Sequence, residues 1–277
     1  MENLTVKDLS IQGILPFLEE TIFADSVENF AQKIKVYPSL DSTNLTAKEM
    51  ILSGVGEHGA VIIADGQTDG RGRHGRSFFS PPGHGLYMSF ILNPDMLGFD
   101  SPALTTIFTA NVVCEAIEAV CGKPPQIKWV NDLFLNGKKI CGISAEMVMD
   151  SENNMLKWLI IGIGINVILL IPSELPVELQ SIVGAIFEHS EEMPSINIRN
   201  QLAAWLISRL PYLTHKKEDI LFQYKQRLFV IGKQVQVMAK EPYEATALNI
   251  DDNGHLLVRD RQGILHVLSA GEISVRA

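Results

Sequence analysis

The chain of 277 residues has few cysteines and no long uninterrupted hydrophobic run. Its three cysteines, Cys114, Cys121 and Cys141, form no CxxC pair, so we expect no disulfide framework and no cysteine-bound metal. Sparse, unpaired thiols are typical of reduced, buried residues in a cytoplasmic protein. The longest apolar run, 159–170, is interrupted by glycines and Asn166 and is too short for a membrane span. The first residues lack the basic stretch and apolar core of a secretory signal.

The chain also has fewer basic than acidic residues. The chain has 23 lysines and arginines against 32 aspartates and glutamates, a formal net charge of −9. An acidic chain repels phosphate backbones, which argues against an extended nucleic-acid surface. Only about 36 residues precede the first expected core strand, and we expect no winged helix-turn-helix there. The basic residues that stand out are clustered, and a local cluster in an acidic chain favours a small anionic ligand.

Hydropathy periodicity and turn signals predict a mixture of helices and strands. A capping box formed by Thr46 and Glu49 marks the start of one helix, and Ser101-Pro102 marks the start of a longer one. We expect helices over 4–20, 45–53, 101–120, 196–210 and 217–228, and strands over 33–37, 60–64, 86–92, 126–130, 142–149 and 155–167. The Asn136-Gly137 pair predicts a hairpin between 133–135 and 138–140.

The C-terminal segment changes character after residue 229. Short strands are expected over 235–237, 245–250, 255–259 and 264–268, with turns at Asn253-Gly254 and Gln262-Gly263. Residues 1–228 are therefore predicted to form one domain, with 1–35 as an N-terminal helical extension, and 229–277 a small β domain.

The segment 70–76, GRGRHGR, carries the strongest chemical signal. Arg71, Arg73 and Arg76 repel one another, so their proximity is explained best by an anion that binds between them. The intervening glycines let backbone N–H groups turn toward such an anion. A flexible basic loop or an arginine-glycine RNA contact is the alternative, but a single loop between strands of an acidic chain favours the small anion.

Two further segments are modest when taken alone. KWVND at 128–132 and KKICGI at 138–143 place polar groups at the end of a strand and Lys139 across a hairpin. Taken alone, this pattern favours an ordinary turn at Asn131 and Asp132 and a solvated lysine. GIGIN at 162–166 lacks the third glycine and the following helix of a dinucleotide-binding motif, so we reject a Rossmann site. We expect its glycines to allow a ligand or another backbone to approach closely.

Taken in order, Ser42-Thr43-Asn44 and these segments resemble the biotin protein ligase family, in its monofunctional form without an N-terminal DNA-binding domain. The resemblance spans 41–166, and the β segment extends it to the chain end. Val130 stands where the family usually has proline, and Phe78 where tryptophan is common. The resemblance implies an α+β fold: a mixed, mostly antiparallel sheet flanked by helices, as in class II synthetases, followed by a small SH3-like β-barrel.

The resemblance also implies the chemistry of the site. An enzyme of this family forms biotinyl-5′-adenylate from biotin and ATP, with Mg²⁺ on the phosphates, and transfers biotin to a lysine of a biotin carboxyl carrier protein of acetyl-CoA carboxylase or another carboxylase. No covalent enzyme intermediate is needed, and we expect a monomer or homodimer. The positions that match the family's ureido-binding residues are Ser42, Thr43, Asn44 and Gln67. Those that match its carboxylate- and phosphate-binding residues are Arg71, Arg73 and Lys139. The resemblance also places Arg76 near the pyrophosphate and implies that Asp132 orients either the metal or the acceptor lysine. Gly70, Gly72, Phe78, Lys128, Asn131, Gly142, Gly162 and Asn166 complete the predicted site.

Two other functions remain open at this level. A lipoate or octanoate ligase shares the fold but binds a long apolar acyl chain, which does not call for these motifs. A biotin-sensing regulator that binds nucleic acid or a partner protein is disfavoured by the acidic charge. An α/β domain with a basic loop and no chemistry is disfavoured by the ordered set of motifs.

Overall fold

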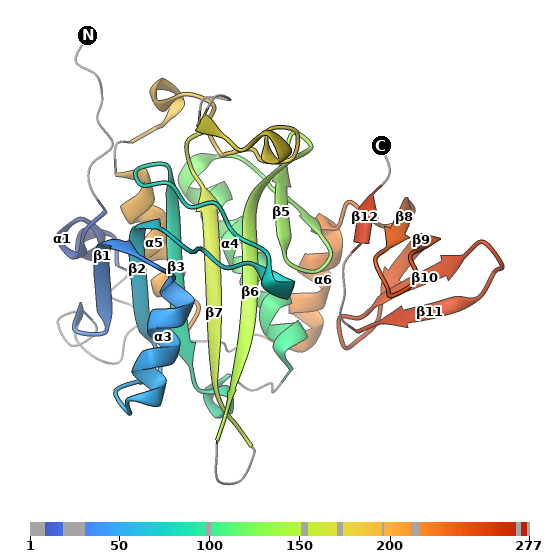
Figure 1. The fold of residues 1–277 in the computed structure, drawn as a ribbon, viewed down its shortest axis with the longest axis horizontal. Helices are drawn as coiled ribbons and strands as arrows, with labels where there is room; N and C mark the ends of the chain where they lie inside the picture. The colour runs from blue at the N-terminus through green and yellow to red at the C-terminus, as the bar shows by residue number, and fades with distance from the viewer. Residues whose placement is uncertain are drawn as a thin grey trace.

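The computed structural model describes residues 9–18, 31–97, 101–150, 155–170, 174–195, 197–211, 216–269 and 273–275. These residues form a seven-stranded and a five-stranded sheet (Figure 1). The larger sheet has the order β1-β2-β3-β7-β6-β5-β4. Its strands are β1 (Ile34–Leu40), β2 (Ala60–Gln67), β3 (Gly85–Leu92), β4 (Gln126–Lys128), β5 (Asp132–Leu135), β6 (Lys138–Met149) and β7 (Leu156–Asn166).

The pairing of the larger sheet is mixed but mostly antiparallel. Strands β1 and β2 are parallel, and the five remaining neighbouring pairs are antiparallel. With helices on both faces, this confirms the predicted α+β class. Asn136 (φ 50°) and Gly137 (φ 76°) both have the positive φ that a tight two-residue hairpin requires. The strands predicted over 142–149 and 155–167 are confirmed within β6 and β7, which pair with each other, and residues 151–154 between them lie outside the described residues.

Helices cover the two faces of this sheet unequally (Figure 1). One face carries α3 (Thr43–Leu52), which packs Ala47 against Ile62 and Ile160. The other carries the larger core, built with α4 (Pro102–Cys121), α5 (Ile198–Ile207) and α6 (Lys217–Arg227). By length and composition Ala103–Cys121 could cross a membrane, but 72% of its most apolar window is buried inside the fold, as in a core helix. The face with α3 therefore has the smaller cover of helices.

The helix ends confirm some of the predicted capping signals and contradict others. Ser101 caps α4 and Gly122 ends it with a φ of 67°, as predicted. The predicted capping box of Thr46 and Glu49 is wrong, because the N-cap of α3 lies four residues earlier: extended Ser42 caps the helix, and the backbone N–H of Thr46 already donates to Ser42 O at 3.0 Å. The helix predicted over 4–20 is described only as α1 (Ile11–Ile14) and the 3₁₀ turn η1 (Leu15–Phe17); residues 4–8 and 19–20 lie outside the described residues.

Several strands are longer than predicted. Strand β1 continues through Pro38 to Leu40 because it lies at the edge of the sheet, where the missing proline N–H interrupts only one position of the ladder. Strand β2 continues to Gln67, three residues beyond the end of the strand predicted over 60–64.

The C-terminal sheet contains the four predicted strands and one more. They are β8 (Gln234–Val237), β9 (Tyr243–Ile250), β10 (Leu256–Asp260), β11 (Leu265–Leu268) and the unpredicted β12 (Ile273–Val275), which pairs with β8. Short antiparallel strands of this kind are compatible with an SH3-like barrel. Val235 and Leu256 belong to the same buried cluster as the core of the larger sheet, so the two sheets pack together. The proposed boundary between residues 228 and 229 stays a prediction.

Candidate functional site

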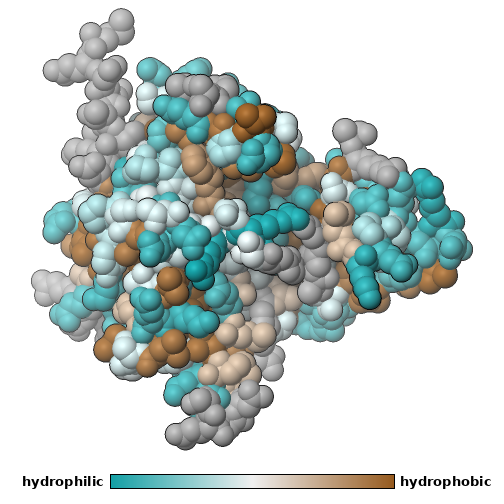
Figure 2. All heavy atoms as spheres, in the orientation of Figure 1, coloured by the Kyte–Doolittle hydropathy of each residue, from teal (hydrophilic) through white to brown (hydrophobic). Residues whose placement is uncertain are grey.

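A small cavity of about 60 Å³ lies where the segment after β2 crosses the face that carries α3 (Figure 1). Figure 2 shows hydrophilic side chains gathered across the middle of this face. Every motif singled out in the sequence contributes to the wall, which is formed by Ser42, Thr43, Asn44, Gln67, Arg71, Gly72, Arg73, Phe78, Asn131, Lys139, Gly142, Ile143, Ser144, Gly162, Ile163 and Gly164. The fold therefore brings segments from residue 42 to residue 164 to one place.

One end of the cavity offers neutral hydrogen-bonding groups. Gln67 Oε1 accepts from Thr43 N at 2.9 Å, and Gln67 Nε2 donates to Ser80 Oγ at 2.8 Å. Asn44 donates through Nδ2 to Ser144 Oγ at 3.1 Å. Ser42, Thr43 and Asn44 are all buried, although they are polar. Buried polar groups held in this way keep fixed directions, which suits recognition of a neutral polar ligand.

The floor of the cavity depends on glycines in β6 and β7. A Cβ at Gly162 would overlap Asn44 Oδ1 and Ser144 Oγ, and one at Gly164 would overlap the ring of Phe78. A Cβ at Gly142 would lie 3.1 Å from the same ring. The glycines thus let α3 and the crossing segment lie directly on the sheet, which supports the interpretation of the GIGIN motif as a close-approach site.

The opposite end is cationic. Lys139 Nζ lies 2.6 Å from Asp132 Oδ1, and Arg73 donates to Asn131 Oδ1 at 2.9 Å. Arg71 is half exposed and pairs with Asp69 at 3.1 Å. A neighbour therefore holds each of these three cations on the cavity wall. Fixed positive charge at one end and neutral polar groups at the other fit a ligand with an uncharged head and an anionic tail.

The connection between β4 and β5, which carries Asn131, is anchored from behind. The peptide bond between Trp129 and Val130 is cis. Trp129 Nε1 donates to Gly254 O of the C-terminal sheet at 3.0 Å, and Tyr224 of α6 donates to Val130 O at 2.9 Å. Burial raises the pKa of the Tyr224 phenol well above its ordinary value, so the hydroxyl stays a neutral donor. Helix α6 and the second sheet thus set the position of Asn131.

A second cavity of about 200 Å³ adjoins the first and shares Phe78 and Lys139 with it. Its walls are mainly apolar and come from the segment that crosses after β2, from residues 168–170 and from residues between 175 and 185. It also contains Arg76 and Asn166 from the predicted site, and Asn166 Nδ2 donates to Gly184 O at 2.9 Å. A ligand in the first cavity could therefore extend past Lys139 into an apolar chamber.

Three predicted residues lie outside both cavities. Gly70 supports the wall, since a Cβ there would collide with Phe78 O and Ser80 Oγ. Lys128 faces Asp132 across the β4–β5 pair, and Asp132 acts on the cavity through Lys139.

Several residues that form or support the cavity wall were not predicted. Ser144 and Gly164 follow the predicted Gly142 and Gly162 at the two-residue spacing that keeps side chains on one face of a strand, so strand periodicity could have found them. Ser89, which is buried behind Thr43 and Asn44, has no motif around it.

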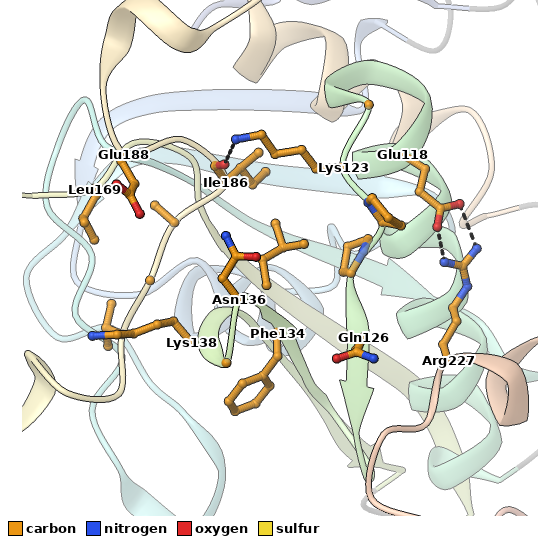
Figure 3. A pocket seen from close by; sticks show the side chains of 18 of the residues that line it. Glu118, Lys123, Gln126, Phe134, Asn136, Lys138, Leu169, Ile186, Glu188 and Arg227 are labelled. Carbon is orange, nitrogen blue, oxygen red and sulfur yellow. Dashed lines mark hydrogen bonds and ion pairs between the residues drawn. The ribbon is translucent and has the colours of Figure 1, made fainter.

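A much larger hollow, of about 1330 Å³, lies elsewhere, between the end of α4, the β5–β6 turn and α6 (Figure 3). None of the predicted site residues lines it. Two basic side chains on its wall bind other residues of the wall: Arg227 forms an ion pair with Glu118, and Lys123 donates a hydrogen bond to Ile186 O at 2.7 Å. Lys138 likewise donates to Gln180 O at 2.8 Å. Size alone therefore does not identify the functional cavity.

Comparisons with known proteins identify the family of the chain. Residues 36–166 match the profile of the biotin/lipoate A/B protein ligase family. The chain is 34% identical over 254 residues to the bifunctional ligase/repressor BirA of Bacillus subtilis, covering 91% of this chain and 77% of the relative. It is 25% identical over 248 residues to a biotin–[acetyl-CoA-carboxylase] ligase of Mycobacterium tuberculosis, covering 87% and 88%.

Solved structures show the same fold. The biotin protein ligase from Aquifex aeolicus in complex with biotin and ATP superposes with a TM-score of 0.72 at 25% identity, covering 88% of this chain and 98% of that one. A biotin protein ligase from Leishmania major in complex with biotinyl-5-AMP superposes with a TM-score of 0.53. The chain belongs to the biotin/lipoate A/B protein ligase family and is a ligase of the biotin protein ligase type.

Proposed function

We propose that this ligase activates biotin with ATP to biotinyl-5′-adenylate and transfers the biotinyl group to a lysine of a carrier protein. The observation that carries the proposal is the polarity of one cavity, which has neutral hydrogen-bonding groups at one end and three cations at the other. The Aquifex aeolicus structure, which holds biotin and ATP, and the Mycobacterium tuberculosis relative, named as an acetyl-CoA-carboxylase ligase, support it.

Biotin matches this polarity. Its ureido ring has two N–H donors and one carbonyl acceptor, which Thr43, Asn44 and Gln67 can satisfy without charge. Its bicyclic ring is compact and apolar, and Phe78, which lies against Gly142 and Gly164 on the cavity wall, offers it an apolar face. The carboxylate tail then points toward Arg73 and Lys139. A lipoyl chain has no ureido group, so it would leave the buried amides and hydroxyls unsatisfied.

The adjoining apolar cavity is the proposed adenosine site. Lys139 lines both cavities, so its ammonium lies at the junction where the carboxylate and the α-phosphate would meet. Mg²⁺, when bound to the triphosphate, supplies further neutralising charge. Among the described residues no group of three histidine, cysteine, aspartate or glutamate side chains could hold a metal ion, so we expect the ion to arrive with ATP.

The first chemical step joins two anions. A biotin carboxylate oxygen attacks the α-phosphorus, the bond to pyrophosphate breaks, and pyrophosphate leaves. Arg71, Arg73 and Lys139 reduce the repulsion between the reactants and stabilise the charge that develops. We propose that Arg76, on the wall of the second cavity, contributes on the pyrophosphate side.

The second step needs no enzyme nucleophile. The acceptor lysine amine attacks the acyl carbon of the mixed anhydride, and AMP leaves. The thiol nearest the site, Cys141, is fully buried, and burial raises its pKa well above the ordinary value, so it is a poor nucleophile. Asp132 is engaged with Lys139; a further role in orienting the metal or the acceptor amine stays a prediction.

The partner and the location are also proposals. We infer that the acceptor is a biotin carboxyl carrier protein, that the reaction takes place in the cytoplasm, and that DNA is not a ligand of this chain.

A single reaction tests the proposed function. The protein is mixed with biotin, ATP, Mg²⁺ and a carrier domain, and the carrier is weighed by mass spectrometry. We expect the carrier mass to rise by one biotinyl group, and a carrier without its acceptor lysine to stay unchanged. Equal or better use of lipoate would identify the lipoate ligase instead. Folded protein that yields neither the adenylate nor a heavier carrier would refute the proposal.

A further inference from the structure

A carboxylate behind the cavity wall controls one of the residues that line it. Glu146 lies in β6, two residues beyond Ser144, and is half-buried. Its Oε1 accepts from Asn44 Nδ2 at 2.6 Å, and Ser144 Oγ lies 3.1 Å from the same nitrogen. Glu146 itself does not line the cavity. Any effect on a ligand must therefore pass through Asn44.

The amide of Asn44 has a defined orientation. A carboxylate oxygen accepts hydrogen bonds, so the NH₂ group must face Glu146, and Oδ1 faces the opposite way. There Ser89 Oγ lies 2.6 Å from Asn44 Oδ1 and 2.7 Å from Thr43 Oγ1. The Ser89 hydroxyl has one proton and Oδ1 can only accept it. Ser89 therefore donates to Asn44 and can receive the Thr43 proton in turn.

Asn44 Oδ1 also lies against the cavity floor. A Cβ at Gly162 would overlap this atom, and both residues line the cavity. A ring that rests on the glycine floor thus meets a hydrogen-bond acceptor at this side. The reverse amide orientation would present the NH₂ group of Asn44, a hydrogen-bond donor, at this side.

Among the three side chains that bond this amide, Glu146 has a distinct role. The hydroxyls of Ser89 and Ser144 can rotate to donate or accept, so they tolerate either orientation. The carboxylate cannot donate, and a reversed amide would place Asn44 Oδ1 against Glu146 Oε1. Glu146 is therefore the member of the network that rejects the reversed amide.

We propose that Glu146 is a positioning residue that fixes the orientation of the Asn44 amide. Because Asn44 Oδ1 then faces the cavity beside Gly162, this side of the cavity selects a cyclic ligand with a ring N–H group over one with a ring oxygen. The inference rests on the proposed function, in which the ligand is the cyclic urea of biotin. It adds a determinant of specificity that does not touch the ligand.

The test compares Glu146→Gln with the wild type. Glutamine keeps the shape but can donate as well as accept, so both amide orientations become possible. Binding is measured by calorimetry for biotin and for the two cyclic-carbamate analogues, in each of which one ring N–H is replaced by oxygen. We expect the wild type to prefer biotin, and the preference over one analogue to fall about tenfold in the variant. KM for biotin should rise while kcat changes little.

Two controls separate positioning from structure. Glu49→Gln makes the same change at an exposed carboxylate of α3 and should keep the wild-type preference and melting temperature. Glu146→Asp keeps a group that only accepts and should retain the preference even if affinity falls. An unchanged biotin-to-carbamate ratio in a folded Glu146→Gln variant would overturn the inference, as would a Glu146→Asp variant without the preference. A wild type that binds no biotin would instead overturn the proposed function.

Discussion

Neighbouring lysines in β6 have different surroundings. Lys138 Nζ donates to Gln180 O at 2.8 Å and lines the large hollow of Figure 3, whereas Lys139 lies 2.6 Å from Asp132 and lines the two adjoining cavities. Successive residues of a strand point to opposite faces, so a one-residue difference moves a cation from one cavity system to the other. The pair therefore provides a matched test of the charge argument.

Lys139→Ala should lower the rate of adenylate formation by about 100- to 1,000-fold, because a fixed cation is lost where two anions meet. Lys138→Ala removes the same charge from the neighbouring position and should keep most of the activity. Pyrophosphate release in the presence of biotin and ATP measures both, with melting curves to show that each variant folds. Near-normal pyrophosphate release by Lys139→Ala would remove this lysine from the mechanism.

Gly162→Ala should weaken biotin binding by about 5- to 150-fold, the effect of an overpacked contact of about 1–3 kcal/mol. The added Cβ overlaps Asn44 Oδ1 and Ser144 Oγ, so it must displace the amide or lift the ligand. Calorimetric titration with biotin measures the loss. Wild-type affinity in the alanine variant would mean that the ligand does not rest on this part of β7.

Sequence motifs identified the residues of the cavity wall better than those behind it. Arg73, Asn131 and Lys139 stand in short segments whose composition is unusual, so they could be recognised. Ser89 and Glu146 bond to Asn44 across 45 and 102 residues of sequence, and nothing near them signals a role. Contacts of this kind depend on strand register, which the sequence does not specify locally.

At the scale of elements, the segment between β2 and β3 shapes the site. Gly72 N donates to Arg76 O at 2.7 Å, and Arg71 and Ser77 form an isolated antiparallel bridge, so the arginine-rich motif folds back on itself around the turn Arg73–Gly75. The sequence indicated a glycine-rich connection here, but this turn was not predicted. Its arrangement depends on contacts with Asn131 and with the glycines of β6 and β7, which are distant in sequence.

We predict that residues 66–77 become protected when the adenylate forms, because a closed segment would shield the mixed anhydride from water. Arg71, Arg73 and Arg76 are trypsin sites within it, so cleavage there reports accessibility. Limited trypsin digestion followed by mass spectrometry should show slower cleavage with biotin plus ATP than with either alone. Equal cleavage rates with and without both ligands would contradict closure.

At the scale of the whole molecule, both sheets contribute to the position of one loop, the connection between β4 and β5. Trp129 bonds to the turn between β9 and β10, and Tyr224 of α6 bonds to Val130, directly before Asn131. The sequence indicated both sheets from strand and turn signals. It did not indicate this junction, because a tryptophan beside a strand end gives no sign of which distant carbonyl it will meet.

A second long-range connection makes the stability of the whole fold sensitive to pH. His58 precedes β2; its Nε2 lies 3.0 Å from Pro211 O, and its Nδ1 lies 3.0 Å from Asn93 N. A carbonyl can only accept and a backbone N–H can only donate, so the ring is neutral, with its proton on Nε2. Burial lowers the pKa of His58 from the ordinary value of 6.5. The hydrogen bond to Pro211 raises the pKa and partly offsets the effect of burial, whereas the positive charge of Lys33 lowers the pKa further.

The unfolded chain therefore binds a proton at His58 more readily than the folded chain does. Stability contributed by the neutral ring is fully present above pH 6.5, the ordinary value, and is lost as pH falls through the lowered pKa. Urea unfolding of the wild type and of His58→Gln between about pH 5 and about pH 8 measures this. The wild type should lose stability relative to the variant as the solution becomes more acidic, since glutamine does not titrate. If the free energies of unfolding of the two proteins changed in parallel with pH, His58 would bind a proton equally well in the folded and the unfolded chain. The connection between Asn93 and Pro211 would then not require a neutral ring.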